Sequence, residues 1–187
     1  MNKEKIKPVD YVGAFANPAK LPRTKKHVLF MGRSNSGKST LLSLLIHNSR
    51  LVKTSATPGS TRLLHVYERE NVFLTDLPGY GFAKISKKER DTLSDIISGC
   101  LQHTDLVTMG MLTIDSRRSL AAEEKYIIEL FLEVGRPLNL VYTKLDKLKQ
   151  SEVQALKKRK HPTNHAFYYS SLKKTGLADI YNTIEAL

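Results

Sequence analysis

The sequence predicts an α/β domain with a mostly parallel six-stranded sheet, one antiparallel edge strand, and helices on both faces. Short apolar runs alternate along the chain with longer amphipathic stretches, which is the pattern of parallel strands joined by crossover helices. Two of the runs, 63–68 and 71–75, are separated by only two residues, which predicts an antiparallel hairpin. The other runs are far enough apart to hold a helix between them.

Residues 1–25 are expected to form an extension that packs on the domain and has a disordered tip. Pro8, Pro18 and Pro22 interrupt any long helix in this part of the chain, and an extended segment is expected over residues 11–15. Residues 26–187 are expected to form one domain, because a chain of 187 residues suits a single core.

Each later element is predicted from its own pattern. Ser86, with Glu89 three residues later, is typical of a helix start, and Gly135 of a helix end. Besides the hairpin, strands are predicted at 27–31, 105–114, 138–142 and 166–169, and helices at 38–47, 86–102, 119–134, 150–160 and 177–186.

The composition favours a cytoplasmic protein with a polyanionic partner. The formal net charge is +12, which suits RNA or an anionic surface, although a basic protein can also be merely soluble. No apolar run approaches the ~18 residues of a membrane span, and the first residues lack the apolar core of a signal peptide. The single cysteine, Cys100, excludes an internal disulfide.

Three groups of basic residues are candidate RNA contacts. Each group alone is better explained by a solvated face, but the three groups and the net charge together favour RNA, bound through phosphate contacts rather than by sequence-specific reading. The groups are Lys84, Lys87, Lys88 and Arg90, then Arg117 and Arg118, and finally Lys157, Lys158, Arg159 and Lys160.

A glycine-rich segment lies between the first predicted strand and the first predicted helix. Residues 32–39 are Gly-Arg-Ser-Asn-Ser-Gly-Lys-Ser, the phosphate-loop pattern in its strand–loop–helix context. Gly32 and Gly37 allow the backbone N–H groups to approach an anion, and the helix start adds further N–H groups. Lys38 supplies a positive charge for the outer phosphates, and Ser39 a hydroxyl for magnesium. The loop alone does not distinguish ATP from GTP.

Three further polar segments follow predicted strands, at residues 76–79, 143–146 and 170–172. Asp76 can hold magnesium directly or through water, and Gly79 can offer its N–H to a terminal phosphate. Asp146 can accept hydrogen bonds from the ring N–H and the exocyclic amine of guanine, both of which adenine lacks on that edge. Because carboxyl ends of parallel strands share an edge, the segments predict one ligand site.

In these motifs the sequence resembles Ras-like P-loop GTPases of the TrmE-Era-EngA-EngB-Septin class. Within that class it is similar to the EngB/YihA/YsxC family of ribosome-biogenesis GTPases, and the resemblance spans residues 9–187. The segments that carry the resemblance are Gly-Arg-Ser-Asn-Ser-Gly-Lys-Ser (32–39), Pro-Gly-Ser-Thr-Arg (58–62), Asp-Leu-Pro-Gly-Tyr-Gly-Phe-Ala (76–83), Thr-Lys-Leu-Asp (143–146) and Tyr-Ser-Ser-Leu-Lys-Lys-Thr-Gly (169–176).

The resemblance implies a Ras-like GTPase domain that binds GTP or GDP with Mg²⁺ and acts in assembly of the large ribosomal subunit. It also implies a role in normal cell division and growth. The magnesium ligands would be Ser39, Thr61 and, through water, Asp76. Thr57 is a weaker candidate than Thr61. Two residues depart from the family pattern: Ser36 stands where a small or aliphatic residue is usual, and Ser60 where a basic one is common.

The expected nucleotide-binding residues come from all the motifs together. They are Gly32, Arg33, Ser34, Asn35, Ser36, Gly37, Lys38, Ser39, Thr40, Gly59, Ser60, Thr61, Arg62, Leu63, Asp76, Leu77, Pro78, Gly79, Thr143, Lys144, Leu145, Asp146, Tyr169, Ser170 and Ser171.

The catalytic group stays open. Ras-type switches orient the attacking water with a glutamine, and Tyr80 stands in its place here. By the resemblance the phenol points away from the phosphates, so slow intrinsic hydrolysis is expected. Lys38, Asn35 and Gly79 are the candidates for direct roles. A potassium ion held by Asn35, or ribosomal RNA or protein acting on residues 79–84, could supply the missing positive charge.

Two other functions fit part of the pattern. One is a non-catalytic RNA-binding module gated by GTP or GDP, and the other is an ATP-using P-loop kinase, against which Asp146 argues. A membrane-associated GTPase would need an anchor that the sequence does not suggest. The expected partners are GTP or GDP and the large ribosomal subunit or its precursors, bound through ribosomal RNA, and the expected state is a monomer.

Overall fold

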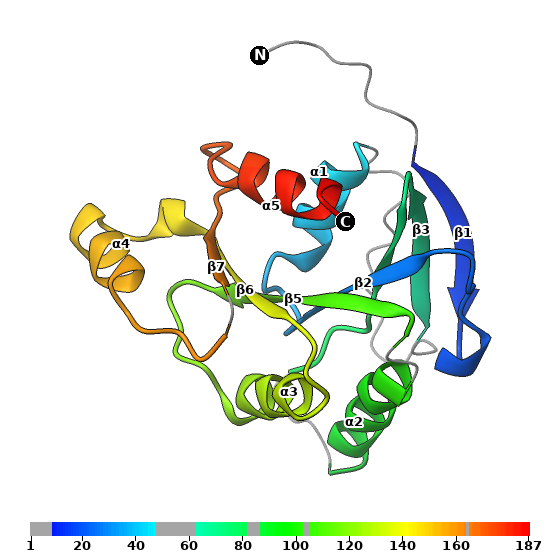
Figure 1. Ribbon diagram of the computed structural model, residues 1–187. Coiled ribbons are helices and arrows are strands. Elements are labelled where there is room, and N and C mark those ends of the chain that lie inside the picture. Colours follow the sequence, from blue (N-terminus) through cyan, green and yellow to red (C-terminus); the bar gives the residue numbers. More distant parts are fainter. Residues whose placement is uncertain (1–8, 48–62, 82–86, 103–104, 164) are drawn as a thin grey trace.

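The computed structural model describes residues 9–47, 63–81, 87–102, 105–163 and 165–187. In this part of the chain a mostly parallel seven-stranded sheet carries helices on both faces (Figure 1), which confirms the predicted α/β class. The strands are β1 (Asp10–Phe15), β2 (Lys26–Gly32), β3 (Leu64–Arg69), β4 (Val72–Asp76), β5 (Val107–Asp115), β6 (Leu138–Thr143) and β7 (His165–Tyr168). The helices are α1 (Lys38–Ile46), α2 (Lys87–Gln102), α3 (Ala122–Glu133), α4 (Gln150–Lys157) and α5 (Leu177–Glu185), with short 3₁₀ turns η1 (Pro18–Lys20) and η2 (Leu145–Lys147).

The sheet has one strand more than the sequence predicts. Its order is β1-β3-β4-β2-β5-β6-β7, in which the strands from β4 to β7 run parallel and β3 runs antiparallel to both neighbours. The additional strand, β1, comes from the expected N-terminal extension and pairs with β3 from Asp10 opposite Glu68 to Phe15 opposite Leu64. It satisfies backbone groups that β3 would otherwise leave unpaired at the edge.

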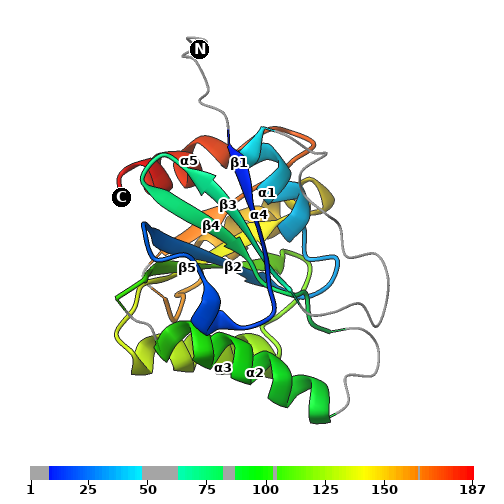
Figure 2. The same cartoon turned by 90° about the vertical axis from the view of Figure 1, so that its right-hand side faces the viewer.

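Helices cover the two faces of the sheet in separate layers (Figures 1 and 2). One face lies against α2 and α3, and the other against α1 and α5. Successive residues of a strand point to opposite faces, so Leu29 and Met31 of β2 join the first cluster while Val28 and Phe30 join the second. Both clusters extend slightly past the carboxyl ends of the strands, through Leu77, Tyr80 and Leu145 in the first and Tyr169 in the second.

Most element ends lie within a few residues of the prediction. Helix α3 is followed by Gly135 at a φ of 65°, and its N–H donates to Leu132, which confirms the predicted helix end. Helix α4 ends at Lys157, three residues early; continuing it would add three further like charges, Lys158, Arg159 and Lys160, to its last turn. The predicted cap at Ser86 and the loop at 50–62 lie outside the described residues. The boundary between extension and domain stays a prediction.

A buried histidine joins β2 to its surroundings. The ring of His27 is fully buried, Nε2 donates to the Pro22 carbonyl (2.8 Å), and Nδ1 therefore accepts from the Thr75 hydroxyl (2.7 Å). Burial disfavours the charged ring and lowers the pKa of His27. The neutral ring is thus favoured by folding, so its stabilising contribution is present above the unfolded-state pKa of about 6.5 and is lost as pH falls.

We expect the free energy of unfolding to decrease as pH is lowered from 7.5 to 5.5. Urea unfolding followed by circular dichroism measures this free energy. The His27→Asn variant should be less stable than the parent at pH 7.5, but its free energy of unfolding should decrease less between pH 7.5 and 5.5. His165→Asn, at an exposed histidine, is the matched control. If His27→Asn shows the same pH slope as the parent, His27 does not cause the acid sensitivity.

Candidate functional site

Four polar segments meet at the carboxyl edge of the parallel strands. They follow β2, β4, β6 and β7, and hydrogen bonds or ion pairs join each segment to another. The segment after β2 is central, because it contacts both the segment after β4 and the segment after β6. The sequence prediction that these segments lie together at one edge agrees with the described contacts.

The loop after β2 packs too closely on β5 to accept a side chain at its start. A Cβ atom at Gly32 would lie 2.1 Å from the Thr113 hydroxyl oxygen, which also hydrogen-bonds Ser36 (2.7 Å). Gly37 precedes α1 at a φ of 94°, where it caps the helix without a side-chain hydrogen bond. The first N–H groups of α1 therefore stay available for an anion.

Lys38 and Asp76 form an ion pair between the first turn of α1 and the end of β4. Both side chains are buried, with 9% and 7% of their surface exposed. Ser39 follows at the same helix start and is half-buried. A carboxylate and a hydroxyl at one place are oxygen ligands of the kind Mg²⁺ takes beside phosphates, so these residues fit a magnesium ion.

The loop after β6 is hydrogen-bonded to the phosphate loop at two places. Thr143, which stands where related motifs carry asparagine, donates its hydroxyl to the Ser36 carbonyl (2.5 Å). Lys144 has a left-handed backbone (φ 58°), and its Nζ donates to the Asn35 carbonyl (2.6 Å). Threonine thus provides the loop-to-loop hydrogen bond despite the departure from the usual residue.

Asp146 is held by the last of the four segments. The Ser170 hydroxyl donates to its carboxylate (2.6 Å), and this hydrogen bond lowers the pKa of Asp146. The backbone N–H of Leu145 donates to the Tyr169 carbonyl (3.4 Å), which fixes the two segments side by side. Tyr169 is buried and Ser171 is exposed. The carboxylate is therefore charged, oriented and partly open to solvent, as the recognition of two N–H donors requires.

The Tyr80 side chain packs in the core, while its backbone is bridged to the phosphate loop. Its ring is buried in the core, and its hydroxyl lies 3.5 Å from Glu124 of α3. Burial raises the pKa of Tyr80 well above the usual value, so the phenol stays neutral. Its backbone is bridged to the loop instead: Ser34 N–H donates to the Tyr80 carbonyl (2.5 Å). This bridge also brings Gly79 beside Ser34, because a Cβ at Gly79 would lie 3.3 Å from the Ser34 hydroxyl oxygen.

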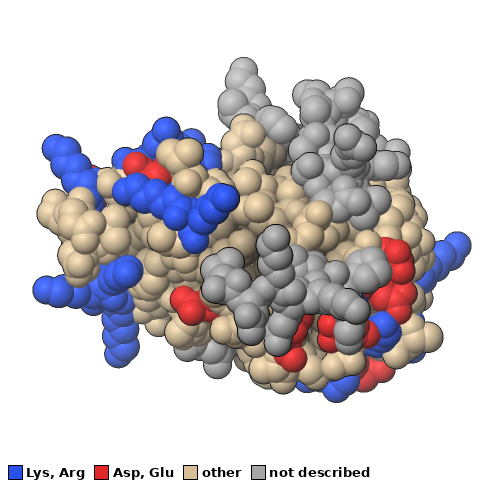
Figure 3. Space-filling view, turned by 90° about the horizontal axis from the view of Figure 1, so that it is seen from above, with Lys and Arg blue, Asp and Glu red and all other residues tan. Residues whose placement is uncertain are grey.

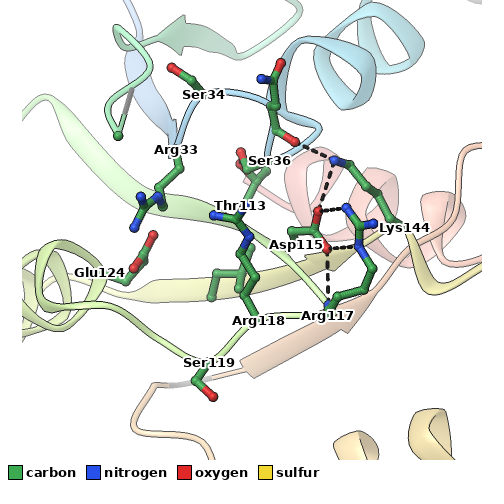
Figure 4. Close-up of a pocket in the computed structure, with 13 residues that line it drawn as sticks. Arg33, Ser34, Ser36, Thr113, Asp115, Arg117, Arg118, Ser119, Glu124 and Lys144 are labelled. Atoms are coloured by element: carbon green, nitrogen blue, oxygen red, sulfur yellow. Dashed lines mark hydrogen bonds and ion pairs between the residues drawn. The ribbon is translucent and has the colours of Figure 1, made fainter. Parts of the chain in front are cut away.

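One acidic residue of this edge is absent from the sequence-predicted set. Asp115 ends β5, between β2 and β6, and its carboxylate accepts from Arg117 (2.6 and 2.9 Å) and from Lys144 (3.0 Å) (Figure 4). These donors, chiefly Arg117, lower the pKa of Asp115 well below its usual value. Asp115 could have been found from the sequence, because it ends an apolar strand in the same way as Asp76, which was predicted.

The remaining predicted residues divide by position. Leu77 is buried, and its backbone N–H donates to the Phe30 carbonyl (3.0 Å). Pro78 is half-buried and Thr40 of α1 is exposed. Leu63 directly precedes β3. Four of the predicted residues lie outside the described residues: Gly59, Ser60, Thr61 and Arg62. The expected magnesium ligand Thr61 is therefore not placed by the structure. Within the described ranges, no three His, Cys, Asp or Glu side chains are grouped as metal ligands. No helix there is long and apolar enough to cross a membrane.

The chain is similar to known GTP-binding proteins over most of its length. A family model described as 50S ribosome-binding GTPase matches residues 27–144. A probable GTP-binding protein EngB from Chlorobaculum tepidum is 38% identical over 149 residues, which cover 79% of this chain and 78% of that protein. Another, from Clostridium botulinum, is 34% identical over 188 residues, which cover 96% of this chain and 95% of that protein.

Solved structures agree with the fold. A crystal structure of a probable GTP-binding protein EngB matches 86% of this chain and 97% of its own, with a TM-score of 0.68 and 23% identity. Aquifex aeolicus Era bound to GDP and aluminium fluoride matches 84% of this chain and 55% of its own, with a TM-score of 0.60 and 26% identity. The phosphate loop, the buried Lys38–Asp76 pair and these matches together show that the chain belongs to the EngB family of GTP-binding proteins and is a GTPase.

Proposed function

We propose that the edge formed by the four segments binds GTP and GDP, and that Asp146 and Ser170 select guanine. The observation that carries this proposal is the Ser170–Asp146 hydrogen bond, which orients a charged carboxylate at the edge that holds the phosphate loop. Guanine presents two adjacent N–H donors to such a carboxylate, whereas adenine would leave the charge unpaired. The stem of Lys144, held at Asn35 and Asp115, can lie along the base.

The phosphates would bind at the start of α1. The free N–H groups after Gly37 and the ammonium of Lys38 would hold them, and Lys38 would exchange its contact with Asp76 for the ligand. Ser39, Asp76 and, from the family resemblance, Thr61 would hold magnesium, which when bound neutralises phosphate charge. Released from Lys38, the Asp76 carboxylate would face that ion directly or through water.

Intrinsic hydrolysis is proposed to be slow. The residue in the place of the water-orienting glutamine, Tyr80, has its hydroxyl beside Glu124 on α3. The candidates for direct roles, Lys38, Asn35 and Gly79, include no general base. The proposed rate is no more than about 10⁻⁴ to 10⁻³ per second, as for unassisted Ras.

Potassium is the proposed source of additional positive charge. Asn35 is exposed, has a left-handed backbone (φ 64°) and lies in the phosphate loop, where its side chain is open to an ion. We expect hydrolysis to be at least about tenfold faster in potassium than in sodium chloride of equal strength, because a cation at this place would stabilise the charge that an arginine finger, worth about 10³- to 10⁵-fold, stabilises in other GTPases. Phosphate release measures it, and Asn35→Ala should remove the difference. Equal rates in both salts for the parent would contradict a potassium site.

The protein is proposed to act as a GTP-dependent switch in assembly of the large ribosomal subunit. It is proposed to be a cytoplasmic monomer that is needed for normal cell division and growth. The match to a model of 50S ribosome-binding GTPases supports this partner, as does the net charge of +12. Lys and Arg side chains gather on the side of the molecule where α4 lies (Figure 3), and Lys157, Lys158, Arg159 and Lys160 are all exposed there. Such a surface suits phosphates of ribosomal RNA.

Co-sedimentation with large ribosomal subunits and their precursors tests the proposal. We expect more protein in the particle fraction with a non-hydrolysable GTP analogue than with GDP, and displacement by salt. Competition between GTP and ATP in the same preparation tests the base preference. Equal sedimentation in both nucleotide states, or none, would contradict a nucleotide-controlled role on this subunit.

A further inference from the structure

A pocket of about 270 Å³ lies on the outer side of the phosphate loop, between that loop, the end of β5 and the start of α3 (Figure 4). Lys38, Asp146 and Ser170 do not line it, but Arg33 to Ser36 and Lys144 do, so the pocket adjoins the proposed nucleotide site and shares the phosphate loop with it. Its polar lining comprises Arg33, Ser34, Asn35, Ser36, Thr113, Asp115, Arg117, Arg118, Ser119, Glu124 and Lys144.

The cationic side chains that line the pocket outnumber its carboxylates. Four cationic side chains line it against two carboxylates. Asp115 is already occupied by Arg117 and Lys144, and Glu124 is buried, accepting from the Ala121 N–H (2.7 Å) and lying beside the Tyr80 hydroxyl. Asp115 is therefore paired with two cations, and Glu124 is held by hydrogen bonds.

Arg118 is the cation that remains available. Its side chain extends from the loop after β5 toward the phosphate loop in Figure 4, is exposed, and makes no ion pair with any residue in the described part of the chain. Arg33 lies on the other side of the pocket and forms an ion pair with Glu123 at 3.9 Å. Two guanidinium groups facing one cavity, with hydroxyls of Ser34 and Ser119 at its wall, are donors suited to a tetrahedral anion.

We propose that this pocket binds a backbone phosphate of RNA, with Arg118 and Arg33 as its donors. Naming RNA as the source of the phosphate rests on the proposed function, whereas the anion site itself rests on the geometry. The pocket holds a single phosphodiester, and its position at the molecular surface leaves the rest of the strand outside. The Arg117–Asp115–Lys144 group forms a fixed wall that keeps the phosphate loop in place beside the bound strand.

The same pocket would respond to the nucleotide. Gly81, one of the lining residues, follows Tyr80 in the sequence. The Tyr80 carbonyl accepts a hydrogen bond from the backbone N–H of Ser34 in the phosphate loop. A γ-phosphate that draws in the N–H of Gly79 shifts this bridge and hence the wall of the pocket. RNA affinity then differs between the two nucleotide states, and by linkage RNA changes the relative affinity for GTP and GDP by the same factor.

The test measures binding of naked large-subunit ribosomal RNA by filter retention, with the protein loaded with GDP or with a non-hydrolysable GTP analogue. In the GTP-analogue state we expect Arg118→Glu to weaken binding about tenfold or more, and Arg118→Ala to reduce the slope of log affinity against log salt by about 1. The matched control is Lys125→Glu, which also replaces a positive by a negative charge but at an exposed position of α3 that does not line the pocket. GDP affinity and circular dichroism should stay unchanged in all three variants.

Equal losses in Arg118→Glu and Lys125→Glu, or no retention of RNA by the parent protein, would overturn the pocket as an RNA site. A ratio of RNA affinities in the two nucleotide states that is the same in the parent and in Arg118→Ala would overturn its response to the nucleotide. Co-sedimentation with subunit precursors gives a separate result for the ribosomal role. RNA binding that depends on Arg118 without subunit binding would uphold the pocket and reject that role.

Discussion

Replacing Asp146 with asparagine should lower the affinity for GDP about 10²- to 10⁴-fold and create affinity for xanthosine diphosphate. The carboxylate is charged and held by Ser170 at 2.6 Å, so it can accept from two guanine donors. Each hydrogen bond to a charged acceptor is worth about 1.5–3 kcal/mol, and two of them account for this range. An asparagine amide offers a donor instead, which suits the additional carbonyl of xanthine.

Titration calorimetry with GDP, ADP and xanthosine diphosphate measures this change. Ser170→Ala is the graded comparison: it removes the hydrogen bond that orients Asp146 but keeps the charge, so we expect a loss of about tenfold without a new base preference. Unchanged GDP affinity in Asp146→Asn would mean that guanine is recognised by other residues, and the proposed base site would be rejected.

The edge of the site was predictable because it depends on features that the sequence displays locally. A strand that ends in Asp76 or Thr143 shows its end as a change from apolar to polar residues. Parallel strands then place these ends together without knowledge of the side-chain packing. The contacts Lys38–Asp76 and Ser170–Asp146 follow from that arrangement, although they span 38 and 24 residues of sequence.

Features that depend on pairing between distant segments were not predictable in the same way. Strand β1 alternates exposed and half-buried residues and has no buried apolar run, so its pairing with β3 leaves little trace in composition. Asp115 is recognisable as a strand end, but its two partners are defined only once β5 and β6 are in register. Arg117 and Arg118 are adjacent in sequence and both line the pocket, but among the described residues only Arg117 has an ion-pair partner, Asp115.

Replacing Lys38 with alanine should have two separable effects. Binding of GTP should fall by at least about 100-fold, because the ammonium at the start of α1 is the cation placed to meet the outer phosphates. The protein without nucleotide should also lose about 3–5 kcal/mol of stability, because Asp76 would be left buried without its ion-pair partner. Fluorescent-nucleotide binding measures the first effect and urea unfolding by circular dichroism the second.

A double variant distinguishes the two effects. Lys38→Met combined with Asp76→Leu replaces the buried pair by apolar side chains of similar size, which in other proteins is often neutral for stability. We expect it to recover most of the stability that Lys38→Ala loses while still failing to bind GTP, and Lys147→Ala, at an exposed lysine near the same edge, to match the parent in both measurements. If the double variant regains GTP binding together with stability, Lys38 supports the fold and does not hold the phosphates.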